Sequence, residues 1–150
     1  MTYDIKKLKQ LREETGVSFS LCKKALEETN NDINEAKKML TKWGADKVKD
    51  KASRETAAGA LFSYVHHNRK VASLIELLCE TDFVSGNKEF QNLGQELAMQ
   101  IASLKAETVD ELMKQEYIRD PSKKISDLIK EAVLKFGENI KVGKLIRLEI

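Results

Sequence analysis

Hydrophobic residues recur every three or four positions through most of the first 55 residues, the spacing of one face of an α-helix. Polar residues and glycine interrupt this pattern twice, which predicts three short helices. Gly16 suits the left-handed end of the first helix, Ser18 or Ser20 can cap the second, and Asp32 can cap the third. The predicted buried positions are Ile5, Leu8, Leu11, Leu21, Cys22, Ala25, Leu26, Ile33, Ala36, Met39, Leu40 and Trp43.

The composition changes after the third helix, which Gly44 is predicted to end. Residues 45–54 carry alternating charges and few large apolar side chains, so they are predicted to form a solvated helical linker. The alternative is a basic stripe that contacts an acidic partner. We therefore predict a helical domain over residues 1–55 and a second domain over residues 56–150.

From Gly59 onward the pattern becomes that of strands. Leu61–Val65 and Val71–Leu78 are rich in strand-forming residues and flank a polar turn, which predicts a β-hairpin. Residues 141–150 alternate apolar and charged side chains, as expected of a half-buried terminal strand.

Helical spacing returns between the hairpin and the terminal strand. The apolar positions of these helices are Phe90, Leu93, Leu97, Ile101, Leu104, Val109, Leu112, Met113, Ile125, Leu128, Ile129, Ala132 and Val133. Asp120-Pro121-Ser122 is predicted to begin the last helix and Gly137 to end it. The predicted fold class is α+β: an N-terminal three-helix bundle, a helical linker, and a three-stranded antiparallel sheet with helices packed on one face.

The segment Cys79-Glu80-Thr81-Asp82-Phe83-Val84-Ser85-Gly86 joins the hairpin to the next helix. Apolar periodicity resumes only near Phe90, so Thr81 and Asp82 are predicted to lie in a loop. This leaves Phe83, a large apolar side chain, in a short loop beside a carboxylate. Phe83 either folds back onto its own core or anchors in a pocket of a partner, with Asp82 steering it.

The balance of basic and acidic residues argues against two classes of protein. With 26 basic and 24 acidic residues the net charge is +2, without the basic excess of a dedicated nucleic-acid or membrane-surface binder. No segment has the length of a membrane span or the apolar core of a signal peptide. Cys22 and Cys79 are far apart and lack a CxxC pair, which predicts buried, reduced thiols in a cytoplasmic protein.

No set of residues predicts an enzyme. The seven glycines form no phosphate-binding motif. His66 and His67 are adjacent, so in an extended chain their rings would point to opposite sides, which disfavours a metal site. We therefore expect a binding protein with no cofactor and no metal ion of its own.

Four stretches resemble the elongation factor Ts family. Residues 11–16 and 22–28 look like its N-terminal ubiquitin-associated-like bundle. Cys79–Val84 matches its CETDFV signature, and Phe136–Ile140 is similar to its IGENI signature, with phenylalanine in place of isoleucine. At Ser18-Phe19-Ser20 the chain departs from the family's Gly-Met-Met run. These matches follow the family's order along the whole chain.

The resemblance implies a guanine-nucleotide exchange factor that binds elongation factor Tu with GDP during translation. Asp82 and Phe83 would wedge into the partner's nucleotide-binding domain and disturb its Mg²⁺ and phosphate binding, which promotes release of GDP. GDP and Mg²⁺ are ligands of the partner and not of this chain. The full set of partner-binding residues implied is Thr81, Asp82, Phe83, Val84, Lys9, Arg12, Phe19, Ser20, Phe136 and Gly137.

Long forms of this family pack two similar subdomains together, so the resemblance also implies that a short chain pairs with itself as a homodimer. Two other functions stay open on the residues alone. One is a ubiquitin-associated-type peptide-binding adaptor built on the N-terminal bundle. The other is a ribosome- or RNA-associated factor that uses a basic stripe over residues 42–54.

Overall fold

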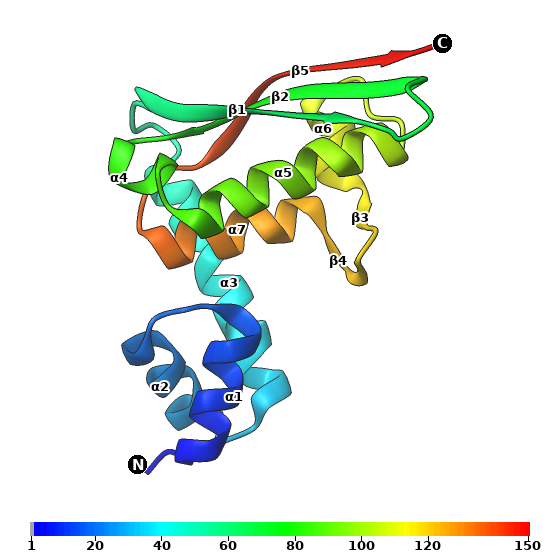
Figure 1. Cartoon of the computed structure of the whole chain (residues 1–150). Helices are drawn as coiled ribbons and strands as arrows, with labels where there is room; N and C mark the ends of the chain where they lie inside the picture. Colours follow the sequence, from blue (N-terminus) through cyan, green and yellow to red (C-terminus); the bar gives the residue numbers. More distant parts are fainter. Residues whose placement is uncertain (1) are drawn as a thin grey trace. The chain divides into compact units, whose positions relative to one another are not determined.

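The computed structural model describes residues 2–150, which form two compact units. The first unit comprises residues 2–52 and Lys130–Gly137, and the second comprises Ser53–Ile129 and Glu138–Ile150. Figure 1 labels the elements in chain order. They are α1 (Ile5–Thr15), α2 (Phe19–Glu28), α3 (Ile33–Lys51), β1 (Ala58–Val65), β2 (Val71–Cys79), α4 (Asp82–Ser85), α5 (Lys88–Ser103), α6 (Val109–Lys114), β3 (Glu116–Tyr117), β4 (Asp120–Lys124), α7 (Ile125–Phe136) and β5 (Lys141–Glu149).

The three predicted N-terminal helices are present, and their ends follow from their capping residues. Ser18 accepts a hydrogen bond from the backbone N–H of Leu21, and Asp32 accepts one from Glu35 at 3.0 Å. Gly16 ends α1 with a φ of 66°, a conformation that costs glycine little. The core of this unit contains Leu8, Leu11, Val17, Cys22, Ala25, Leu26, Ala36, Leu40 and Leu134.

The prediction that Gly44 ends the third helix is wrong, because α3 continues without interruption to Lys51. Gly44 is buried, and a Cβ atom built on it would lie 3.0 Å from the carbonyl oxygen of Lys130 in α7. Close helix packing therefore explains this glycine. Leu134 also packs into the N-terminal core, so part of α7 belongs to the first unit. The ranges 1–55 and 56–150 stay a prediction.

The second unit is built on a three-stranded antiparallel sheet in the order β1-β2-β5, which confirms the predicted fold class. Figure 1 shows α5 running along one face of this sheet. The side chains buried between them include Ile75, Leu77, Phe90, Leu97 and Ile101. The other face carries exposed apolar residues from all three strands: Leu61, Val65, Leu74, Ile146 and Leu148.

The prediction that Asp120-Pro121-Ser122 begins the last helix is wrong. These residues belong to β4, which pairs with β3 in a small two-stranded ribbon, and α7 begins at Ile125. The buried side chain of Gln100 holds this ribbon on α5. Its amide nitrogen donates to the carbonyl of Glu116 at 3.0 Å, and its amide oxygen accepts from the N–H of Ile118 at 3.1 Å.

The expected separation of the two histidine rings is also wrong. The hairpin turn brings the ring centroids of His66 and His67 to 4.1 Å of each other, because residue 67 has left the extended strand. The hydroxyl of Tyr64 lies 3.0 Å from Nδ1 of His66. In residues 2–150, three or more histidine, cysteine, aspartate or glutamate side chains nowhere gather as a metal site would require.

Candidate functional site

The segment after β2 forms one turn of helix, so the prediction of a loop at Asp82 and Phe83 is wrong. In α4 the backbone N–H of Gly86 donates to the carbonyl of Asp82 at 2.9 Å. Successive residues of a helix point about 100° apart, so Phe83 and Val84 face different directions. Val84 is 8% exposed and Phe83 is 92% exposed. Phe83 therefore does not fold back onto its own core.

The side chain of Val84 is buried, unlike the exposed side chains of Asp82 and Phe83. Val84 was predicted to contact a partner, yet its side chain is directed into the protein and anchors α4, which contacts β1, β2 and α5. Asp82 is exposed and lines a hollow of about 420 Å³ with residues of β1 and β2. An aromatic residue and a carboxylate that are adjacent in sequence are therefore both exposed on a short helix that Val84 anchors.

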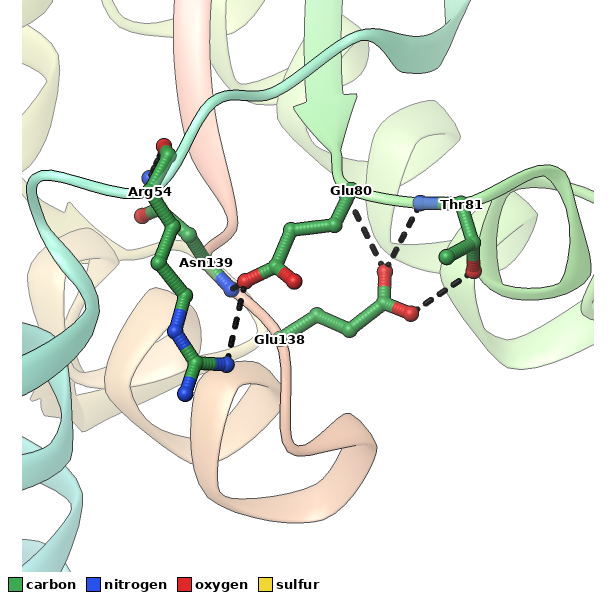
Figure 2. Close-up of polar contacts among 5 residues, drawn as sticks. All are labelled: Arg54, Glu80, Thr81, Glu138 and Asn139. Carbon is green, nitrogen blue, oxygen red and sulfur yellow. Dashed lines mark hydrogen bonds and ion pairs between the residues drawn. The ribbon is translucent and has the colours of Figure 1, made fainter.

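Two segments far apart in the sequence bind each other at the base of α4, as Figure 2 shows. The carboxylate of Glu138 accepts hydrogen bonds from the backbone N–H groups of Glu80 and Thr81, both at 3.1 Å, and from the hydroxyl of Thr81 at 2.7 Å. In the opposite direction, the carboxylate of Glu80 accepts from the backbone N–H of Asn139 at 2.8 Å.

Arg54 completes this arrangement. Its guanidinium donates to the Glu80 carboxylate at 3.5 Å, and its carbonyl oxygen accepts from the side-chain amide of Asn139 at 2.8 Å. Asn139 is 5% exposed, and its buried amide therefore has the partner that burial requires. We call these five residues, Arg54, Glu80, Thr81, Glu138 and Asn139, the clasp.

Cys79 lies at the end of β2, next to the clasp. Its buried thiol donates to the carbonyl of Thr81, with Sγ and the oxygen 3.2 Å apart. Burial, followed by the negative charge of Glu138, raises the pKa of the Cys79 thiol. Burial also raises the pKa of Cys22. Both cysteines are unpaired and buried, as predicted, and neither has the lowered pKa of a reactive thiol.

Four other candidate residues lie at the surface of the first unit. Lys9 and Arg12 are exposed on α1, and Phe19 and Ser20 are exposed at the start of α2. Phe19 is 46% exposed and contacts the edge of the Tyr3 ring, with centroids 6.2 Å apart. A cationic pair and an aromatic residue are therefore both accessible on this unit.

Phe136 and Gly137 lie at the end of α7, also in the first unit. Phe136 is partly exposed, and burial lowers the pKa of its neighbour Lys135. Gly137 has a φ of 70° and its N–H donates to the carbonyl of Val133, so it ends the helix as predicted. Among residues 2–150, apart from its two chain neighbours, no atom lies within 4 Å of the position of a Cβ on Gly137, and Gly137 is exposed.

The structure thus groups Thr81, Asp82, Phe83 and Val84 on one short segment of the second unit, while the other six candidates belong to the first. Sequence reasoning missed Arg54, Glu80, Glu138 and Asn139 as parts of the site. Three of these four stand inside the two signature stretches, where their polar side chains were a signal. Arg54 lies in a charged stretch without a distinguishing pattern.

Residues 2–150 contain no helix with both the length and the apolar composition that crossing a membrane requires.

Comparisons with known proteins match both parts of the chain to the same family. A family model described as "Elongation factor TS" matches residues 80–150, and one described as "Elongation factor Ts, mitochondrial, N-terminal" matches residues 1–47. The elongation factor Ts of Thermosipho melanesiensis is 37% identical over 190 residues, which covers 97% of each chain. This alignment is longer than the present 150 residues, so that relative has residues without a counterpart here.

Two further relatives show the same similarity. The elongation factor Ts of Leptospira biflexa is 35% identical over 195 residues, covering 100% of this chain and 98% of that protein. The one from Aquifex aeolicus is 40% identical over 152 residues, which cover 98% of this chain and 52% of that longer protein. Since the likeness extends over nearly the whole length, the chain belongs to the elongation factor Ts family, a family of translation elongation factors.

Proposed function

We propose that this protein is a guanine-nucleotide exchange factor that binds elongation factor Tu carrying GDP and promotes release of the GDP. The observation that carries the proposal is Phe83, whose ring is 92% exposed on a helix anchored by its neighbour Val84. An exposed large aromatic residue beside a carboxylate suits insertion into a pocket of a partner. Membership of the elongation factor Ts family, whose members act on elongation factor Tu, supports this choice of partner.

The mechanism follows from linkage between two binding equilibria. A factor that binds the nucleotide-free partner more tightly than the GDP-bound partner weakens GDP binding by the same ratio, and each tenfold corresponds to about 1.4 kcal/mol. Burial of the Phe83 side chain would contribute about 1.5–3 kcal/mol toward this difference. No covalent bond is made or broken in this role. GDP and Mg²⁺ are bound by the partner and not by this protein. The exchange reaction takes place in the cytoplasm.

Asp82 and the residues of the first unit supplement this anchor. Asp82 steers the approach and sets the register of Phe83, because a rim charge acts mainly on association. The exposed Lys9, Arg12, Phe19 and Ser20 provide a second contact with the partner. The accessible end of α7 at Phe136 and Gly137 provides a third.

The test is the rate at which fluorescent GDP leaves elongation factor Tu when the protein is added. We expect Phe83→Ala to slow the stimulated release at least about tenfold, because it removes the aromatic side chain whose burial in the partner would contribute about 1.5–3 kcal/mol. Asp82→Ala should have a smaller effect that diminishes with added salt. Ile118→Ala is the matched control, since Ile118 is an exposed apolar residue of the same unit outside the site.

The second unit also supports a homodimer. Its uncovered sheet face presents Leu61, Val65, Leu74, Ile146 and Leu148, each at least 42% exposed. Leu74 lies directly opposite Ile146, and Val65 and Leu148 both lie opposite Ala72, so apolar residues of all three strands gather on this face. A two-fold dimer brings the same patch of two copies together. We propose that this face joins two chains.

A further inference from the structure

Beyond the anchor itself, we infer that Glu138 is a positioning residue: its carboxylate holds the start of α4 so that Phe83 is already oriented before the partner arrives. The inference rests on the proposed function, since it concerns how the same aromatic ring is presented. The hydrogen bonds of Glu138 described above go to the residues before Phe83 and not to Phe83. It acts through Glu80 and Thr81, to which it makes three hydrogen bonds.

α4 cannot hold this orientation by itself. It has four residues, and an isolated single turn of helix is unstable because nucleation fixes several residues for few hydrogen bonds. A threonine at the position before a helix usually caps it with its hydroxyl. Here the Thr81 side chain makes no such cap, and its hydroxyl donates to Glu138 instead. The usual local cap is thus replaced by a contact with a residue 57 positions away.

Every polar group of Thr81 is occupied in this way. Its N–H and its hydroxyl are bound to Glu138. Its carbonyl accepts from the Cys79 thiol at 3.2 Å and from the N–H of Ser85 at 3.2 Å. The N–H, the hydroxyl and the carbonyl of Thr81 are therefore all hydrogen-bonded, immediately before Asp82 and Phe83 in the chain. Figure 2 shows that Glu138 approaches Thr81 from a separate segment, the loop between α7 and β5.

Fixing α4 in the free protein affects binding more than the exchange step. When only a fraction of molecules presents the competent orientation, the apparent dissociation constant rises by the inverse of that fraction. Once bound, Phe83 occupies the same pocket in a variant as in the wild type. Loss of Glu138 should therefore raise the concentration needed for half-maximal GDP release and leave the maximal rate nearly unchanged.

The first measurement is hydrogen exchange in the free protein. In Glu138→Ala we expect the amides of residues 80–86 to exchange at least about tenfold faster, because the local opening free energy falls when these bonds are lost. Glu138→Gln keeps one oxygen that can accept the two N–H bonds and should lie between wild type and Glu138→Ala. Glu55→Ala is the matched control, because Glu55 is an exposed glutamate outside the clasp. Glu55→Ala should leave the exchange rates of the amides of residues 80–86 unchanged.

The second measurement titrates the same variants against elongation factor Tu with fluorescent GDP. We expect Glu138→Ala to raise the half-maximal concentration at least about fivefold, with a maximal rate within about twofold of wild type. Thr81→Val removes only the hydroxyl bond and should have a smaller effect of the same kind. Added to Glu138→Ala it should change little more, because the two groups act through one contact.

Two results would overturn the inference while leaving the proposed function intact. One is unchanged hydrogen exchange over residues 80–86 in Glu138→Ala. The other is faster exchange there without any rise in the half-maximal concentration. A wild-type protein that does not accelerate GDP release would refute the proposed function, and the inference with it. Glu138→Gln and Thr81→Val decide the matter if Glu138→Ala does not fold.

Discussion

At the residue scale, Gly94 lies within α5 where the helix meets the ring of Phe62. A Cβ atom built on Gly94 would lie 2.1 Å from Cε2 of that ring, far inside contact distance. Replacing glycine by alanine inside a helix normally stabilises it by about 1 kcal/mol. Overpacking of a tight core costs about 1–3 kcal/mol, so the steric effect should exceed the gain in helix propensity.

We therefore expect Gly94→Ala to lower the free energy of unfolding by about 1–2 kcal/mol, measured by denaturant titration followed by circular dichroism. Adding Phe62→Leu should recover part of the loss, because the smaller side chain makes room for the new methyl group. A Gly94→Ala protein as stable as wild type would show that α5 and β1 can move apart without cost.

At the scale of elements, the β3–β4 ribbon is held to α5 by polar contacts that surround Glu96. The hydroxyl of Tyr117 donates to the Glu96 carboxylate at 2.9 Å, and the guanidinium of Arg119 donates to the same oxygen at 2.6 Å. Burial and then the hydrogen bond to Glu96 raise the pKa of Tyr117 to about 12. A raised pKa means that folding favours the protonated hydroxyl.

The stabilisation from Tyr117 should therefore be complete below about pH 10, where the unfolded tyrosine is also protonated, and should be lost as pH rises through about 12. Absorbance at 295 nm during alkaline titration checks this. The tyrosine that disappears in Tyr117→Phe should ionise with a midpoint near 12. A midpoint near 10, the value of a free tyrosine, would contradict the contact with Glu96.

At the scale of the whole molecule, the uncovered sheet face predicts an oligomeric state. A monomer of 17.0 kDa should be in equilibrium with a species of twice that mass, visible by sedimentation at increasing concentration. Leu74→Lys should shift this equilibrium to the monomer, because burial of an unpaired charge is unfavourable. Leu104→Lys is the control, since Leu104 is similarly exposed but lies outside the sheet. A 17.0 kDa species alone at high concentration would exclude the dimer.

Local patterns predicted most of the fold because the spacing of apolar residues shows which face of each helix or strand is buried. The helical spacing in residues 1–55, the hairpin and the terminal strand all appear in the structure. The errors fall where a distant residue overrides the local pattern. Gly44 packs against α7 instead of ending its helix. Pro121 lies in β4, which pairs with β3, and Gln100 of α5 binds this ribbon at Glu116 and Ile118.

The candidate site was also only partly predictable from the sequence. The sequence by itself determined that an aromatic residue and a carboxylate follow β2, and that the chain resembles elongation factor Ts. Only the tertiary structure decided that Phe83 faces solvent and that Val84 does not. The physical reason is that the contacts of α4 come from residues far away in the chain. Glu138 reaches Thr81 across 57 positions, and no periodicity within a short segment can encode that contact.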